Sequence, residues 1–470
     1  MNDILYMAPL STINFKTSPL SRNSAPKQAQ QDIKMKSLRW DSRTCLSLSE
    51  LKELGIDTKN IRGSNDSSHN HFNNNYSSQG KIFSEGTERT LSEVIMQKPS
   101  TALSSKYIPD SRDEQQTQTA YIRDMTEIGK IEGFNVTTID SPLLTEGNHY
   151  MKGPWNKFIM EKTNPWLEDY NLVCDNGSFM SNYNHPILIQ ELNEYSCNCE
   201  INQAEKLNNQ INPNSFNINK SCAKKVIVNG GNVLTTLNNE GKTKVLVNEY
   251  YLLGIVSKTE GADINEVKEF IAEQLGVDIG DVIYLNLPEQ HIDMFLRPGF
   301  AGSLFINDFK LSNTVIDNIL STPKFLNRLS KEEVSQLTAI KNTTKNNHTQ
   351  LGAYFSKITK VLKENGFTLV KVPGSFQSVD DELREKTTAI NFMNGIMATG
   401  KKGPYYITNG SNIPILNTIF ASILKMHEID NIYFVGRNEE KTNYSAGHDS
   451  ILHHGGIDCR TIERGTDRIR

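Results

Sequence analysis

The chain has 470 residues, a net charge of -4 and a hydrophobic fraction of 37%. With so even a charge balance, no broad basic field favours nucleic acid as a partner, and the length allows one large domain or two ordinary ones. The hydrophobic fraction is below the usual globular range, which indicates that part of the chain contributes little to a core.

That part is the N-terminus. Residues 1–112 are rich in Ser, Asn, Thr and Gln and have few apolar runs, so they are predicted to form a polar, largely disordered or weakly structured arm. One short amphipathic helix is expected over residues 47–56, with Leu48, Leu51 and Leu54 on one side. Because the arm has little core-forming content, a chain that begins near residue 112 is expected to remain folded.

The N-terminal sequence and the cysteines bear on the compartment and on metal binding. The first twenty residues lack a basic start and a continuous apolar stretch, so neither a Sec signal peptide nor a membrane span is predicted. Six cysteines are too few for a disulfide scaffold and favour a reducing, cytoplasmic compartment. Export by a route that needs no signal peptide stays an open alternative. Cys197 and Cys199 lack a second ligand pair at zinc-finger spacing, so neither a metal site nor another cofactor is expected.

Beyond the arm, a helix followed by a strand recurs along the chain. This unit is predicted at residues 117–141, 264–288, 351–373 and 415–436. A weaker fifth unit has its helix at 186–197 and its strand at 224–236, and further strands are expected at 244–255, 302–311 and 405–416. The repetition indicates one α/β domain over residues 113–470, with an insert at about 321–350.

Polar motifs follow several of these elements. They are CDNG at 174–177, NGG at 229–231, HIDMFLRPG at 291–299 and HHGGIDC at 453–459. Strand ends that converge can deliver such side chains to one site. The glycines before the final cysteine give the backbone freedom for close approach, which an inert core thiol would not need. The three nearby histidines, predicted to lie on a loop over the site and not to bind metal, are His448, His453 and His454.

In this order and on this repeated background, the motifs resemble those of the pentein superfamily of guanidine-modifying enzymes. That family includes agmatine, arginine and peptidylarginine deiminases, dimethylarginine dimethylaminohydrolase and amidinotransferases. CDNG is similar to its Arg-Asp-x-Gly motif, NGG to its acid-Gly-Gly motif, HID to its His-x-Asp motif and GGIDC to its Gly-Gly-x-x-Cys motif. The resemblance covers residues 115–470 and implies a pentein-type α/β propeller of five quasi-repeated ββαβ modules.

The resemblance also implies a reaction, the cysteine-dependent hydrolysis of a guanidinium group by a deiminase that acts on arginine, agmatine or a protein arginine. Cys459 would attack the guanidinium carbon and form a thiouronium intermediate, while His291 would move protons to the leaving amine and from water. Asp175 and Asp293 would bind the N–H edges of the cation.

Other polar residues receive supporting roles. Arg297 is the candidate substrate-binding residue for a carboxylate, with Arg437 and Arg460 as alternatives. Asn229 stands where the family has an acid that orients the catalytic histidine, beside Gly230 and Gly231. A neutral amide can fix the ring but cannot stabilise an imidazolium as a carboxylate does, so another acid has to be sought; the candidates are Glu249 and Glu289.

Two other functions stay open. One is an amidinotransferase that passes an amidino group from arginine to an amine, and the other is a non-catalytic guanidine- or arginine-binding protein that has lost turnover at Asn229. The expected partner is a guanidine-containing small molecule or the arginine side chain of a protein, which the N-terminal arm or the insert at 321–350 would help to dock. Neither nucleic acid nor a membrane is expected.

Overall fold

The structure is a computed structural model of the whole chain. It describes residues 39–58, 89–99, 111–139, 171–173, 179–181, 230–249, 252, 263–275, 277–287, 291–300, 302–375, 390–437, 444, 447 and 455–467. The chain divides into two units, residues 1–37 and 38–470, and every described residue belongs to the second unit. Among these residues, no helix is both long enough and apolar enough to cross a bilayer.

Three small sheets in the described part of the chain share one pattern of pairing, in which an antiparallel pair of strands is followed by a parallel third strand. Because a parallel connection needs a crossover, helices lie between the second and third strands. The sheets are β5 (Val233–Leu237), β6 (Thr243–Asn248) and β7 (Val282–Leu285); β8 (Leu296–Pro298), β9 (Ser303–Asn307) and β10 (Thr368–Val372); and β11 (Ile396–Gly400), β12 (Gly403–Asn409) and β13 (Asn431–Val435).

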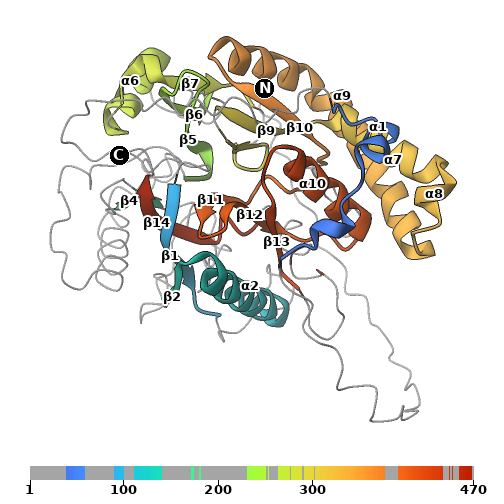
Figure 1. The fold of residues 1–470 in the computed structure, drawn as a ribbon. Helices are drawn as coiled ribbons and strands as arrows, with labels where there is room; N and C mark the ends of the chain where they lie inside the picture. Colours follow the sequence, from blue (N-terminus) through green and yellow to red (C-terminus); the bar gives the residue numbers. More distant parts are fainter. Residues whose placement is uncertain are drawn as a thin grey trace, which may run out of the picture. The chain divides into compact units, whose positions relative to one another are not determined.

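The crossover helices follow the same order along the chain (Figure 1). They are α6 (Ile264–Gln274) in the first of these sheets, α7 (Phe309–Ser321), α8 (Pro323–Leu326) and α9 (Lys331–Glu364) in the second, and α10 (Pro414–Met426) in the third.

A fourth sheet repeats the pattern with strands from opposite ends of the chain. β14 (Thr461–Asp467) pairs antiparallel with β1 (Arg89–Gln97), which pairs parallel with β2 (Asn135–Ile139) after the crossover helix α2 (Ser111–Glu132). A further pair, β3 (Asn171–Val173) and β4 (Phe179–Ser181), is antiparallel. The expected mixed α/β class with small sheets is therefore confirmed.

The predicted helix-strand units match α2 and β2, α6 and β7, α9 and β10, and α10 and β13. Local chemistry explains where the helices begin. Pro414 occupies the first turn of α10, and Ser330 forms a capping box with Glu333 at the start of α9. The predicted helix at 186–197 lies outside the described residues, and β5 covers the end of the predicted strand at 224–236.

The predicted insert at 321–350 is helical and belongs to the packed fold. It comprises α8 and the first part of α9, and it buries Phe325, Leu337 and Ile340 in the same core cluster as α7 and α10. The buried side chains show that this segment extends the helical layer, because each removes apolar surface from water. Docking of a macromolecule by the segment stays a prediction.

The predicted domain boundary near residue 112 is wrong, because β1 is the central strand of its sheet. Val94, Ile95 and Met96 of this strand are fully buried. The compact unit begins at residue 38. The polar residues around the apolar run at 94–96 hide it in the composition, and the pairing of β1 with β14 joins residues more than 360 positions apart.

The segment 39–58 also packs on the domain. The backbone N–H of Trp40 donates to the Ile432 carbonyl at 2.7 Å, and Leu51 and Leu54 are buried. The expected short helix is confirmed as α1 (Leu48–Glu53), but Leu48 is 49% exposed, so two of the three predicted leucines contact the core.

Deletion of residues 1–110 is therefore expected to abolish cooperative thermal unfolding, because it removes the strand between β14 and β2 together with its buried face. The matched control is a chain that begins at Leu38, which retains all the described contacts. Circular dichroism melting curves of the two chains test this. A cooperative transition of the shorter chain at the Tm of the control would contradict it.

Candidate active site

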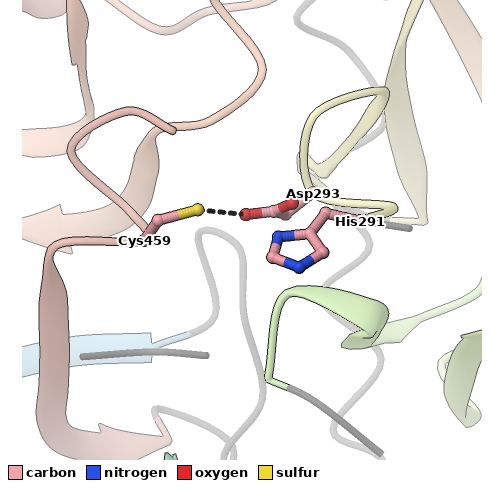
Figure 2. A group of neighbouring side chains, drawn as sticks. All are labelled: His291, Asp293 and Cys459. Carbon is pink, nitrogen blue, oxygen red and sulfur yellow. Dashed lines mark hydrogen bonds between the residues drawn. The ribbon is translucent and has the colours of Figure 1, made fainter. Parts of the chain in front are cut away.

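Three of the predicted residues lie together. Cys459 comes from the turn before β14, and His291 and Asp293 come from the loop before β8 (Figure 2). One side-chain ligand atom from each residue lies within 4.8 Å of the other two, and the Cys459 thiol donates to Oδ2 of Asp293 at 3.1 Å. Cys459 and Asp293 are buried, whereas His291 is partly exposed. The arrangement places a thiol, a carboxylate and an imidazole within reach of one bound molecule.

The glycine motif packs directly on the histidine loop. A Cβ at Gly231 would lie 2.6 Å from Nδ1 of His291, so only glycine lets the imidazole ring lie against this turn. The Gly231 carbonyl also accepts the backbone N–H groups of Ile292 at 2.8 Å and Asp293 at 3.3 Å. One short turn thereby fixes both the ring and the backbone that carries the carboxylate.

The Asp293 carboxyl group is fully buried. Its Oδ2 accepts from Cys459, while its buried Oδ1 has no hydrogen-bond partner in the part of the chain that the structure describes. Burial raises the pKa of this carboxyl group, and the nearby His291 and Arg297 oppose the increase. An ionised carboxylate held in this way favours a ligand that brings positive charge and N–H donors.

Asn394, in the loop before β11, completes the cluster and was not predicted. Its Nδ2 donates to Oδ2 of Asp293 and, at 2.9 Å, to Sγ of Cys459. Its Oδ1 accepts the backbone N–H of Gly456 at 2.8 Å and that of Cys459 at 3.3 Å. Asn394 lies before a strand, so the pattern of polar motifs that follow strands does not indicate it.

Arg297, the candidate for binding a substrate carboxylate, is engaged with another part of the protein. Its side chain is fully buried, and its guanidinium forms an ion pair with Asp458, the residue before Cys459. This pair ties the strand β8 to the cysteine turn, and removing one partner would leave an uncompensated buried charge. Arg297 therefore ties β8 to the turn that carries Cys459, and its role in binding a substrate carboxylate stays a prediction.

The two alternative arginines are also engaged inside the protein. Arg460 is fully buried and donates to Oε1 of Gln118 at 2.8 Å, and Arg437 lies 3.6 Å from Asp124. Glu249, a candidate acid, accepts from Lys268 at 2.5 Å.

The remaining predicted residues lie outside the described residues, and their roles stay predictions. They are Asp175, Asn229, Glu289, His448, His453 and His454. Gly230 lies with Gly231 in the short 3-10 turn Gly230–Asn232.

Comparisons with known proteins give only distant likenesses. No family model matches the sequence, and no curated protein matches it. Among solved structures, the chain is similar to agmatine deiminase of C. jejuni, with 12% identity, 84% of this chain and 100% of that chain covered and a TM-score of 0.48. It is also similar to a dimethylarginine dimethylaminohydrolase adduct, with 12% identity, 80% and 100% covered and a TM-score of 0.37.

A mutant of DDAH from Pseudomonas aeruginosa in complex with citrulline shows a similar likeness, with 11% identity, 80% of this chain and 100% of that chain covered and a TM-score of 0.36. At such TM-scores, the function has to be argued from the side chains of the site.

Replacing Asp293 with asparagine is expected to raise Tm at pH 8 by about 2 °C, because it removes a buried charge whose folded-state pKa is raised. A carboxyl group with a raised pKa binds its proton more tightly in the folded protein. Its ionisation therefore costs stability as the pH rises above the unfolded-state value, and the gain in Tm of Asp293→Asn should shrink as the pH falls.

Differential scanning calorimetry between pH 5 and pH 8 measures this gain. Asp278→Asn is the matched control, since Asp278 is exposed and its side chain makes no capping hydrogen bond. A lower Tm for Asp293→Asn than for wild type at pH 8 would show that the ionised carboxylate stabilises the fold.

Proposed function

We propose that this chain is a cysteine-dependent guanidine hydrolase, a deiminase that acts on arginine, agmatine or a protein arginine. The observation that supports this most is the buried carboxylate of Asp293 beside the thiol of Cys459 and the imidazole of His291. A guanidinium matches this group, because it carries a delocalised positive charge, a planar edge of N–H donors and an electrophilic central carbon.

The proposed reaction begins when the substrate cation binds Asp293 and takes the place of the thiol contact to that carboxylate. The thiol proton passes to His291, and the thiolate attacks the guanidinium carbon to form a tetrahedral adduct. The imidazolium of His291 returns that proton to the leaving nitrogen, the carbon–nitrogen bond breaks, and ammonia leaves a thiouronium bound to Cys459.

The second half of the reaction restores the enzyme. His291, now neutral, accepts a proton from water as the water oxygen attacks the thiouronium carbon. The carbon–sulfur bond then breaks, the hydroxyl proton of the adduct passes to the released ammonia, and the product is a ureido group in place of the guanidinium. The imidazolium of His291 returns its proton to the thiolate. One water is consumed and one ammonia is released in each turnover.

The proposal includes a pentein-type propeller of five ββαβ modules. Four sheets with the same strand order support it, and β3 with β4 would supply part of the fifth module. Asp175 falls in the sequence between these two strands and would be the second carboxylate that grips the guanidinium. The substrate would be a guanidine-containing small molecule or a protein arginine, in a reducing compartment.

The test is an assay for ureido product and ammonia with arginine, agmatine, methylarginines and arginine-containing proteins. Wild type is expected to release both in equal amounts from at least one of these compounds, and Cys459→Ala to release none. Asp293→Asn should lower kcat/KM by roughly 30- to 1,000-fold, because it removes about 2 to 4 kcal/mol of charge-assisted binding in the transition state.

The matched control for the nucleophile is Cys45→Ala, since Cys45 is a partly buried thiol packed against a separate core cluster. Full activity of Asp293→Asn alongside an inactive Cys459→Ala would rule out guanidine chemistry in favour of another thiol reaction. Ornithine formed from arginine only when an amine acceptor is present would indicate amidino transfer. Guanidine binding without any product would indicate a binding protein.

A further inference from the structure

We infer that Asn394 is a further catalytic residue, whose side-chain amide donates a hydrogen bond to the sulfur of Cys459 and holds the thiolate in place for attack. The inference deepens the proposed function, on which it depends for the reaction served. The contact with the nucleophile is independent of the substrate. No motif in the sequence pointed to this residue.

The orientation of the amide follows from its partners. The backbone N–H groups of Gly456 and Cys459 lie 2.8 and 3.3 Å from Oδ1 of Asn394, and a backbone N–H can only donate. The carbonyl oxygen of the side chain must therefore face the cysteine turn. Nδ2 of the same amide therefore faces Sγ of Cys459, at 2.9 Å, and the carboxylate of Asp293.

The glycine motif before Cys459 makes this approach possible. A Cβ at Gly456 would lie 2.6 Å from Oδ1 of Asn394 and 2.2 Å from Nδ2 of Asn409. Both distances are shorter than van der Waals contact allows, so any larger residue would push the amide away from the turn. The second glycine of the motif therefore creates the space that Asn394 fills.

The loop that carries Asn394 is anchored on both sides. The Tyr406 hydroxyl donates to the Phe392 carbonyl at 2.6 Å, and Thr408 donates to the same oxygen at 3.0 Å. Nδ2 of Asn391 donates to the Met294 carbonyl at 3.1 Å, which ties this loop to the histidine loop. With its backbone held in this way, Asn394 is pre-organised and not free to swing toward its partners.

The side-chain amide of Asn394 is needed when the thiol of Cys459 loses its proton. In the structure, the S–H of Cys459 donates to Asp293. Once the thiol loses its proton, that hydrogen bond disappears and the sulfur and carboxylate become two neighbouring anions. Nδ2 of Asn394 has two N–H groups and contacts both atoms, so it stabilises the charged form of each. Nδ2 thereby stabilises the thiolate from the loss of its proton until it attacks the bound cation.

Asn394→Asp tests this with the least change in shape. It keeps an oxygen for the two backbone donors of the cysteine turn but replaces the donor to Sγ with a second carboxylate oxygen. The rate of Cys459 alkylation by iodoacetamide, followed by peptide mass spectrometry across pH, is expected to have its midpoint shifted upward by about one unit. That shift corresponds to about a tenfold slower alkylation below the midpoint. In turnover, kcat should fall at least as much, without an increase in KM.

Asn394→Ala is the second variant, and Asn417→Ala is the matched control. Asn417 is a buried asparagine that also anchors a loop through both side-chain atoms, accepting from and donating to the backbone of Ser411 at 2.8 and 2.9 Å. Its substitution should leave the alkylation profile unchanged. Melting curves of all variants separate loss of folding from loss of the donor.

Alkylation midpoints that stay at the wild-type value in folded Asn394 variants would overturn the inference, whether or not guanidines are hydrolysed. Failure of both Asn394 variants to fold while Asn417→Ala folds would also overturn it, in favour of a purely structural role. A shifted midpoint in a protein that converts no guanidine would uphold the role of Asn394 and reject the proposed guanidine hydrolysis.

Discussion

The burial of one carboxylate, that of Asp293, governs how the surrounding loops are built. Removing an ionised carboxylate from water is unfavourable unless donors or a cation compensate it. The described residues supply donors to Oδ2 from Cys459 and Asn394 and leave Oδ1 without a hydrogen bond. Within the described residues, the charge of the Asp293 carboxylate is therefore only partly compensated, and a bound cation would complete the compensation.

Segments from distant parts of the chain meet around this carboxylate, and they pack so closely at two glycines that a larger side chain would clash. Gly231 leaves room for the His291 ring and accepts the backbone N–H of Asp293. Gly456 leaves room for Asn394. At Gly231 and Gly456, glycine is required because a side chain would clash at a point of close approach. The lack of a side chain matters more at these two positions than any unusual backbone conformation.

The sequence predicted those features of the fold and site that depend on local sequence patterns. Helix-strand units with clear periodicity were found, and the motifs that carry His291, Asp293 and Cys459 do meet. What it could not predict depends on long-range contacts. β1 carries one short apolar run, residues 94–96, and pairs with β14 near the other end of the chain. Asn394 belongs to none of the predicted motifs, and the partner of Arg297 depends on which loop packs beside β8.

The position of Arg297 also bears on the charge of Asp293. The protein already has a guanidinium close enough to favour ionisation of Asp293, yet its ion pair is with Asp458. If Arg297 paired with Asp293 directly, the carboxylate would be satisfied, and a substrate cation would have to displace a buried arginine. The ion pair of Arg297 with Asp458 instead fixes the cysteine turn, and Oδ1 of Asp293 has no hydrogen bond within the described residues. A guanidinium of the protein itself, the same type of cation that the proposed substrate presents, is therefore held by Asp458, the residue before Cys459, where it supports the site without occupying it.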